Sequence, residues 1–234
     1  MPNQAFCILA AGTGGRLGSL TSKINKVLLP VGGKPAISYI IDKIPDGTDI
    51  VICLGYEKEA IIEFCQFTYP ERKFIFVDDV NYRNQGRGPG TGLLECKEYL
   101  NRPFYLCCND CIVDEKYPDL DCNWMGLAKT DNPSIYSTAL VDNNNIIDFV
   151  NKSPEGYEMA FIGLAGIKNH ELFWESLENG LKIEAGELVP AFYNPTKYGL
   201  ISKEFTWHDT GTKEAYDLTC ESFSSNAVNG IKKK

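Results

Sequence analysis

Two short runs near the N-terminus combine the residue types that bind phosphate. They are Leu9-Ala10-Ala11-Gly12-Thr13-Gly14-Gly15-Arg16 and Lys26-Val27-Leu28-Leu29-Pro30. Small residues and glycines let backbone N–H groups approach a ligand closely, and Arg16 and Lys26 add two positive charges for a polyphosphate. The apolar run from Phe6 to Ala11 is typical of a buried strand. The two runs therefore predict a phosphate-binding loop at the end of a strand.

Two other glycine motifs are excluded by single residues. A dinucleotide-binding fingerprint requires a glycine three places after Gly14, where Leu17 stands. A Walker loop requires Ser or Thr after Gly33-Lys34, and Pro35 follows instead. An ordinary glycine loop is the remaining alternative, and the spaced cations Arg16 and Lys26 favour the phosphate site over it.

Length and charge limit the class of protein. A chain of 234 residues is expected to form one domain with a sizeable core. We place this domain at residues 1–226, followed by a flexible tail at 227–234. The net charge of -8 argues against nucleic acid or an anionic membrane as partner. No basic leader or apolar run of about 18 residues predicts a signal peptide or a membrane span.

The nine cysteines are predicted to pack as small hydrophobic side chains. Cys7, Cys53 and Cys107 lie in apolar runs, which favours a cytoplasmic location with reduced thiols. Cys108 to Cys111 spells C-x-x-C, but a zinc site needs a second matched pair and a redox motif usually opens a helix. Core packing is therefore favoured there, with metal or redox chemistry as the alternative.

Strand and helix patterns alternate through the first half of the chain. Strands are predicted at residues 49–56, 73–77 and 103–109, and helices at 58–67 and at the segment with Ile37, Ile40, Ile41 and Ile44. The second half is richer in strands, predicted at 124–128, 134–141, 146–150 and 159–167, with helices at 170–179, at 188–193 and finally to about Phe223. The predicted fold is α/β, with one mixed, mainly parallel sheet flanked by helices.

Two loops that follow predicted strands add candidate binding residues. A polar loop from Asn84 to Gly92 precedes a predicted helix through Leu100. Its composition suits a nucleobase pocket in which Gln85 binds the edge of the base. A flexible surface loop is the alternative that fits the same composition. Asp110 ends the strand at 103–109. Because ligands bind beyond the carboxyl ends of parallel strands, Asp110 is expected to face the glycine loop. With Arg16 and Lys26 in the same crevice, a metal-ligand role is favoured over a turn cap.

Over nearly its whole length the chain resembles the sugar-1-phosphate nucleotidyltransferases. The resemblance lies in the opening LAAGTGGRL with KVLLP, the strand-end Asp110 and the late His208-Asp209-Thr210-Gly211-Thr212. It implies a Rossmann-like nucleotide-diphospho-sugar transferase fold, with nucleotide bound by residues 1–112 and acceptor by 113–226. It also implies Mg²⁺ held by Asp110 and Asp209, with Arg16 and Lys26 as catalytic residues.

The resemblance implies further ligand contacts at specific positions. The nucleotide contacts would come from Leu9, Ala11, Gly12, Thr13, Gly14, Gly15, Gln85, Gly90 and Thr91. The acceptor contacts would come from Ser137, Lys152, Gly163 and Glu187. Three positions depart from the family: Gly15 replaces Thr or Ser, Asn151-Lys152-Ser153-Pro154 replaces E-K-P, and Tyr136-Ser137 replaces Tyr-Gly.

The implied activity is transfer of a nucleoside monophosphate from a nucleoside triphosphate to a sugar-1-phosphate, for capsule or cell-surface polysaccharide. One alternative is a phosphocholine-type cytidylyltransferase, because Trp124, Tyr136 and Trp207 could contribute to an aromatic cage. Another is a non-catalytic nucleotide-binding module of the same fold. A glycosyltransferase is less favoured, since its D-x-D pattern, Asp119-Leu120-Asp121, lies in a polar turn. The expected partners are small-molecule substrates, and a homo-oligomer is compatible with the sequence.

Overall fold

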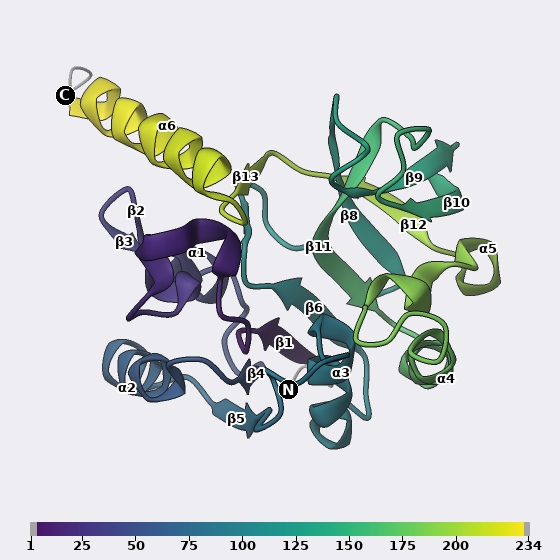
Figure 1. Ribbon diagram of the computed structural model, residues 1–234, viewed down its shortest axis with the longest axis horizontal. Helices are drawn as coiled ribbons and strands as arrows, with labels where there is room; N and C mark the ends of the chain where they lie inside the picture. Colours follow the sequence, from purple (N-terminus) through teal and green to yellow (C-terminus); the bar gives the residue numbers. More distant parts are fainter. Residues whose placement is uncertain (1–3, 232–234) are drawn as a thin grey trace.

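The computed structural model describes residues 4–231, with side chains described for residues 4–224. The strands of its main sheet are β1 (Ala5–Leu9), β4 (Asp49–Leu54), β5 (Phe74–Asp78), β6 (Phe104–Cys108), β8 (Trp124–Lys129), β9 (Ser137–Asp142), β10 (Asn145–Asn151), β11 (Met159–Ile167) and β12 (Ile201–Glu204). They form one nine-stranded sheet in the order β5-β4-β1-β6-β11-β8-β12-β10-β9 (Figure 1).

The two halves of this sheet differ in strand direction. β5, β4, β1 and β6 pair in parallel, so that Leu9 at the end of β1 lies between Cys53 and Cys108. β11 runs antiparallel to β6 and β8, and β9, β10 and β12 form further antiparallel pairs, while β12 runs parallel to β8. The expected mixed α/β fold is confirmed. The parallel half brings the carboxyl ends of four strands to one edge.

Four helices flank the sheet: α1 (Ala36–Ile41), α2 (Lys58–Thr68), α3 (Pro89–Glu95) and α4 (His170–Gly180). Because side chains alternate along a strand, β1 contributes to two cores. Ala5, Cys7 and Leu9 pack in the core that includes α3 and α4, and Phe6 and Ile8 pack in the core that includes α1 and α2. The first of these cores also contains residues of β8, β10 and β11, so it spans both halves of the chain.

Two small sheets and the remaining helices complete the fold. The small sheets pair β2 (Pro30–Val31) with β3 (Lys34–Pro35), and β7 (Cys111–Val113) with β13 (Trp207–Asp209). The other helices are η1 (Gly15–Thr21), η2 (Lys26–Leu28), η3 (Lys97–Tyr99), η4 (Val189–Phe192), α5 (Pro195–Tyr198) and α6 (Lys213–Ile231). Figure 1 shows α6 leaving the body of the molecule beside β13. The β7–β13 pair returns the end of the chain to the first half.

Some element boundaries differ from those predicted. α3 begins at Pro89, inside the predicted loop, because proline fits the first turn of a helix. The predicted helix at 188–193 is a short 3-10 helix, and the strand predicted from residue 134 begins at Ser137. The last helix continues past Phe223 to Ile231. Residues 232–234 of the predicted tail lie outside the described residues.

The cysteines and the helices bear on two further expectations. All nine cysteines are free thiols, and Cys107 and Cys111 pack in the core with α1 and α2. Within residues 4–231, no helix is long and apolar enough to cross a membrane.

Candidate functional site

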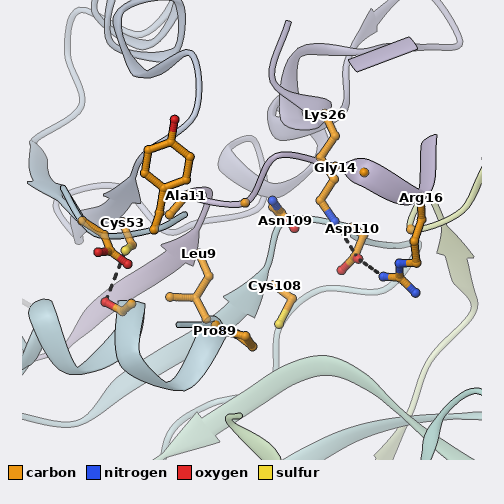
Figure 2. A pocket seen from close by; sticks show the side chains of 17 residues that line it. Leu9, Ala11, Gly14, Arg16, Lys26, Cys53, Pro89, Cys108, Asn109 and Asp110 are labelled. Atoms are coloured by element: carbon orange, nitrogen blue, oxygen red, sulfur yellow. Dashed lines mark hydrogen bonds and ion pairs between the residues drawn. The ribbon is translucent and has the colours of Figure 1, made fainter. Parts of the chain in front are cut away.

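A cavity of about 570 Å³ lies at the carboxyl ends of the parallel strands. Leu9 of β1, Cys53 of β4 and Cys108 of β6 line it, together with Asp79, which follows β5. Figure 2 shows Leu9 between Cys53 and Cys108, as the strand order requires. This is the place where open parallel sheets bind ligands. The expected crevice is therefore present at the end of β1.

Asn25 holds the glycine loop in shape. Its side chain is fully buried, and Nδ2 donates to the carbonyl oxygens of Ala10 at 2.9 Å and Tyr56 at 2.7 Å. Its Oδ1 accepts from the backbone N–H of Val27 at 3.1 Å and so caps η2. The same side chain thus fixes the loop and the position of Lys26. The sequence analysis missed Asn25, although asparagine directly before a short helix is a capping signal.

Gly12 and Gly14 of the loop are glycines for different structural reasons. Gly14 has φ +68°, and a Cβ there would lie 2.8 Å from Cγ2 of Thr21, whose hydroxyl donates to the Gly14 carbonyl at 3.0 Å. At Gly12, by contrast, no atom lies within 4 Å of the Cβ position. Gly14 is therefore required by the fold of the loop, whereas Gly12 leaves its backbone open toward the cavity that it lines.

Two cations and one carboxylate meet at one end of the cavity. Lys26 Nζ lies 2.8 Å from Asp110 Oδ2, and Arg16 Nη2 lies 3.9 Å from the same oxygen (Figure 2). Burial disfavours the charged form of Asp110, but the attraction of Lys26, helped by Arg16, outweighs it and lowers the pKa of Asp110. The side chain of Arg16 is 67% exposed, so it can turn toward a ligand.

Asp209 reaches the same place from the far end of the chain. The pairing of β13 with β7 sets Asp209 opposite Cys111, the residue after Asp110. Asp209 Oδ1 accepts from the Gly211 N–H at 2.7 Å, and Oδ2 accepts from the hydroxyl of Tyr136 at 3.0 Å. A Cβ on Gly211 would lie 3.0 Å from both Asp110 Oδ2 and Asp209 Oδ1. The two carboxylates therefore converge on Gly211, which lines the cavity.

The charges of this pair suit a divalent cation. Burial, and then the negative charge of Asp110, raise the pKa of Asp209. A cation between the carboxylates would offset both effects. No group of three or more His, Cys, Asp or Glu side chains among the described residues could hold a metal. Mg²⁺ often uses only one or two carboxylates and takes its other ligands from phosphates and water, so the pair fits that ion.

The structure brings together most of the predicted phosphate-loop residues. Those that line the cavity are Leu9, Ala11, Gly12, Gly14, Gly15, Arg16, Lys26 and Asp110. The predicted residues outside its lining are Thr13, Gln85, Gly90, Thr91, Ser137, Lys152, Gly163, Glu187 and Asp209. Asp209 is nevertheless adjacent through Gly211.

The predicted base-contacting segment packs against the second half of the chain and lies beside the cavity. Gly90 packs against the second half of the chain: its N–H donates to the Gly186 carbonyl at 2.8 Å, and a Cβ there would lie 2.3 Å from the Glu187 carbonyl oxygen. The hydroxyl of Thr91 bonds to the backbone of Gly88 in the first turn of α3, and Gln85 is exposed. The segment lines the cavity instead through its neighbours Gly88, Pro89 and Gly92.

The predicted acceptor residue Ser137 belongs to a polar network. Its hydroxyl donates to Asn151 Oδ1 at 2.9 Å, and Asn151 Nδ2 donates to Glu184 Oε2 at 3.1 Å. The hydroxyl of Tyr193 donates to the other oxygen of Glu184. Asn151 stands where the family has the acid of E-K-P. Glu184, which the sequence analysis did not single out, supplies a carboxylate to this network.

Among the predicted acceptor residues, Lys152 and Gly163 are distinguished by a positive φ. Lys152 has φ +46°, its N–H donates to the Tyr136 carbonyl at 3.2 Å, and its side chain is exposed. Gly163 has φ +79°, and a Cβ there would lie 2.7 Å from Cβ of Cys108. Gly163 thus allows β11 to pack closely on β6 beside the cavity.

Comparisons with known proteins place this architecture among the nucleotidyltransferases. The family described as MobA-like NTP transferase domain matches residues 6–114. The chain is 32% identical to the bifunctional protein GlmU of Methanococcus aeolicus over 186 residues, which are 77% of this chain and 44% of that protein. The chain therefore spans less than half the length of this curated relative.

Solved structures show the same fold. UDP-glucose pyrophosphorylase complexed with UDP-glucose superposes with a TM-score of 0.77 at 18% identity, covering 95% of this chain and 99% of that one. CTP:phosphocholine cytidylyltransferase of Streptococcus pneumoniae superposes with a TM-score of 0.76 at 18% identity, covering 94% and 98%. These likenesses show that the fold is shared, and the sequence match assigns residues 6–114 to the family of MobA-like NTP transferase domains.

Proposed function

We propose that this chain transfers a nucleoside monophosphate from a nucleoside triphosphate to a sugar-1-phosphate and releases pyrophosphate. One observation carries the proposal: Lys26, Arg16 and Asp110 line one cavity beside an open glycine loop, and Asp209 adjoins this cavity through Gly211. The family supports the same reaction class. The product, an activated nucleotide sugar, would serve cell-surface polysaccharide synthesis in the cytoplasm.

The reaction requires the meeting of two anions. An oxygen of the acceptor phosphate attacks the α-phosphorus in line, a new P–O bond forms, and the bond to the β-phosphate oxygen breaks. Lys26 and Arg16 would neutralise the charge on the departing pyrophosphate, since both already face Asp110 in the cavity. Lys152 would position the acceptor phosphate, which lacks a proton to remove at neutral pH.

No histidine is needed in this scheme. His208 precedes Asp209, but its Nε2 lies 2.9 Å from Asp114 Oδ1 and its ring packs edge-on against Phe223. These contacts give it a structural role. Mg²⁺, which Asp110 and Asp209 would hold, supplies charge neutralisation on the phosphate oxygens when bound.

An acceptor with a quaternary ammonium is the second candidate. The ring of Tyr136 lies 5.3 Å from that of Trp207, edge-on, beside Asp209, and aromatic faces attract such cations. The fold match to the phosphocholine enzyme of Streptococcus pneumoniae supports the inclusion of this acceptor in the test.

The test is pyrophosphate release with Mg²⁺, for each common nucleoside triphosphate crossed with a panel of sugar-1-phosphates and phosphocholine. Release that depends on both substrates and stops with EDTA is the expected result. Release with CTP and phosphocholine alone would favour the second candidate. If triphosphates bind but no pair reacts, the transfer reaction is refuted for these acceptors and a binding module is favoured.

A further inference from the structure

The cavity has a second end, away from the cations. Cys53, Asp79, Gly88 and Gly92 line it there, and Figure 2 shows Cys53 on the side opposite Arg16 and Asp110. If the triphosphate lies along the glycine loop toward Lys26, the nucleobase extends to the end with Cys53. The side chains at that end then determine which base the cavity accepts.

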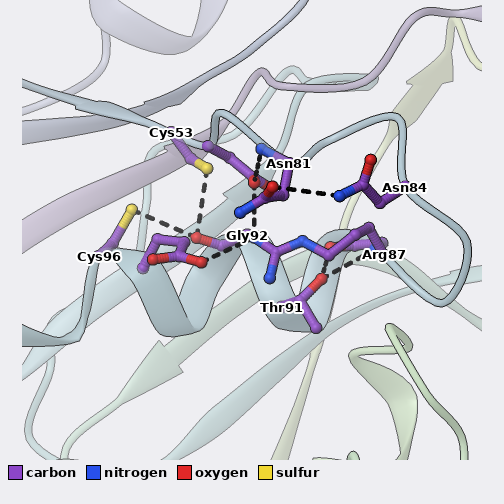
Figure 3. Close-up of polar contacts among 10 residues, drawn as sticks. Cys53, Asn81, Asn84, Arg87, Thr91, Gly92 and Cys96 are labelled. Atoms are coloured by element: carbon purple, nitrogen blue, oxygen red, sulfur yellow. Dashed lines mark hydrogen bonds and ion pairs between the residues drawn. The ribbon is translucent and has the colours of Figure 1, made fainter.

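Asp79 is the charged side chain at that end. It is 2% exposed, and its Oδ1 accepts from the N–H of Asn81 at 3.1 Å and from Nη2 of Arg87 at 2.5 Å. Arg87 is itself held by Glu95, with 2.8 Å from Nη2 to Oε1. Figure 3 shows this network around Arg87, next to Gly92 and Cys53. The carboxylate is therefore fixed in orientation before any ligand binds.

The second oxygen of Asp79 has a different environment. Among the described residues, both donors to Asp79 bind Oδ1 and none binds Oδ2. Oδ2 lies 3.6 Å from the Cβ position of Gly92, a residue of the cavity wall. The lack of a side chain on Gly92 keeps this approach open. Oδ2 is not among the fully enclosed side-chain atoms that lack a partner, and Asp79 lines the cavity, so this oxygen is open to a ligand there. A ligand that places an N–H group at Oδ2 would form a charge-assisted hydrogen bond.

We propose that Asp79 is a specificity-determining residue that selects a nucleobase with an exocyclic amino group. The inference rests on the proposed function, because it assumes that the cavity binds a nucleoside triphosphate. The amino group would donate to Asp79 Oδ2, while Arg87 and Asn81 keep Oδ1 occupied. Cytosine, guanine and adenine all carry such a group.

Uracil and thymine do not meet this requirement. Their one base N–H is flanked on both sides by carbonyl oxygens, which would face the carboxylate and be repelled by it. Sites built to pair a buried polar group discriminate strongly against ligands that leave it unpaired. We therefore expect the cavity to bind an amino-bearing base at least about tenfold more tightly than uracil or thymine.

Direct calorimetric titration with CTP, GTP, ATP, UTP and dTTP, with Mg²⁺ and without acceptor, separates this inference from the transfer reaction. We expect one or more of CTP, GTP and ATP to bind more tightly than UTP and dTTP. The separate titrations identify which base is preferred. Equal affinity for all five, or preference for UTP or dTTP, overturns the inference but not the proposed function. Binding of none overturns both.

Two variants test the residue itself. Asp79→Asn replaces an acceptor oxygen with an amide that can turn its NH₂ toward the base, so affinity for the preferred nucleotide should fall at least about tenfold while that for UTP is kept or rises. Glu95→Gln is the matched control, because Glu95 also pairs with Arg87 but does not line the cavity. It should keep the base preference. An unchanged preference in folded Asp79→Asn, or an equal loss in both variants, overturns the inference.

Discussion

The contact of Gly211 with two carboxylates allows a sharp test of how they act together. In Gly211→Ala, the new methyl carbon would lie 3.0 Å from Asp110 Oδ2 and from Asp209 Oδ1, and 3.3 Å from Arg16 Nη2. Ordinary contacts begin at 3.4 Å, so each oxygen must withdraw by about 0.4 Å (3.4 − 3.0). The backbone conformation of Gly211 is not among those with positive φ, so alanine adds no backbone strain.

The expected loss follows from these displacements. A misplacement of about 1 Å at a reacting centre can lower the rate about a hundredfold. The smaller withdrawal of about 0.4 Å by each carboxylate should therefore lower kcat by about tenfold. The methyl group also occupies space between the carboxylates, so half-saturation should require more Mg²⁺. Overpacking should cost about 1–3 kcal/mol of stability, which thermal unfolding measures separately.

Steady-state kinetics over a Mg²⁺ series provides the assay, and the neighbouring variant Thr212→Ala provides the control. That substitution removes the bond from the Ala215 N–H to Thr212 Oγ1, 3.2 Å long, at the start of α6 and adds no atom near the carboxylates. It should lower stability by up to about 1 kcal/mol with kcat unchanged. If folded Gly211→Ala has the kcat and Mg²⁺ dependence of the unmodified protein, the two carboxylates do not share a catalytic cation.

Three further predictions concern charge. Asp110→Asn should lower kcat at least about a hundredfold, and near-normal turnover of the folded variant would exclude it as a metal ligand. Lys152→Ala should raise the KM of the acceptor with little change in kcat; an unchanged KM would place the acceptor elsewhere. Burial opposes ionisation of Asp49, but Lys73 and Arg102 outweigh it and lower its pKa. Its contribution to stability is therefore complete above the unfolded-state pKa of about 4 and is lost as pH falls through the lower folded-state value. Asp49→Asn should remove this part of the acid dependence of the unfolding free energy, whereas Asp46→Asn, at a fully exposed position, should keep it.

The sequence was sufficient to predict the parts of the site that depend on local patterns. The apolar run of β1 and the glycines after it predicted the loop, and the turn directly after β6 placed the carboxylate of Asp110 in the same crevice. Both predictions follow from the rule that ligands bind beyond the carboxyl ends of parallel strands. The fold class followed from the same alternation of strands and helices.

The residues that were missed depend on partners far away in the sequence. Asn25 acts by bonding Ala10 and Tyr56, and Asn151 meets Glu184 across 33 positions. No local pattern reports such pairs. Gly90 was predicted to contact the base, which stays a prediction. Its close packing on Gly186 is a structural requirement for glycine that only the tertiary contact reveals.

The pairing of β13, near the end of the chain, with β7 affects how acceptor specificity could be transferred between related proteins. The matched domain at residues 6–114 contains Asp110 but not Asp209, which reaches the cavity only through the β7–β13 pair and is held there by Tyr136. A chimera that took residues 113–226 from a relative would import a foreign carboxylate and its support along with a new acceptor pocket. Under the proposed function, acceptor preference and the catalytic centre would therefore be inherited together, and point substitutions around Ser137 and Glu184 would change the acceptor more readily than recombination.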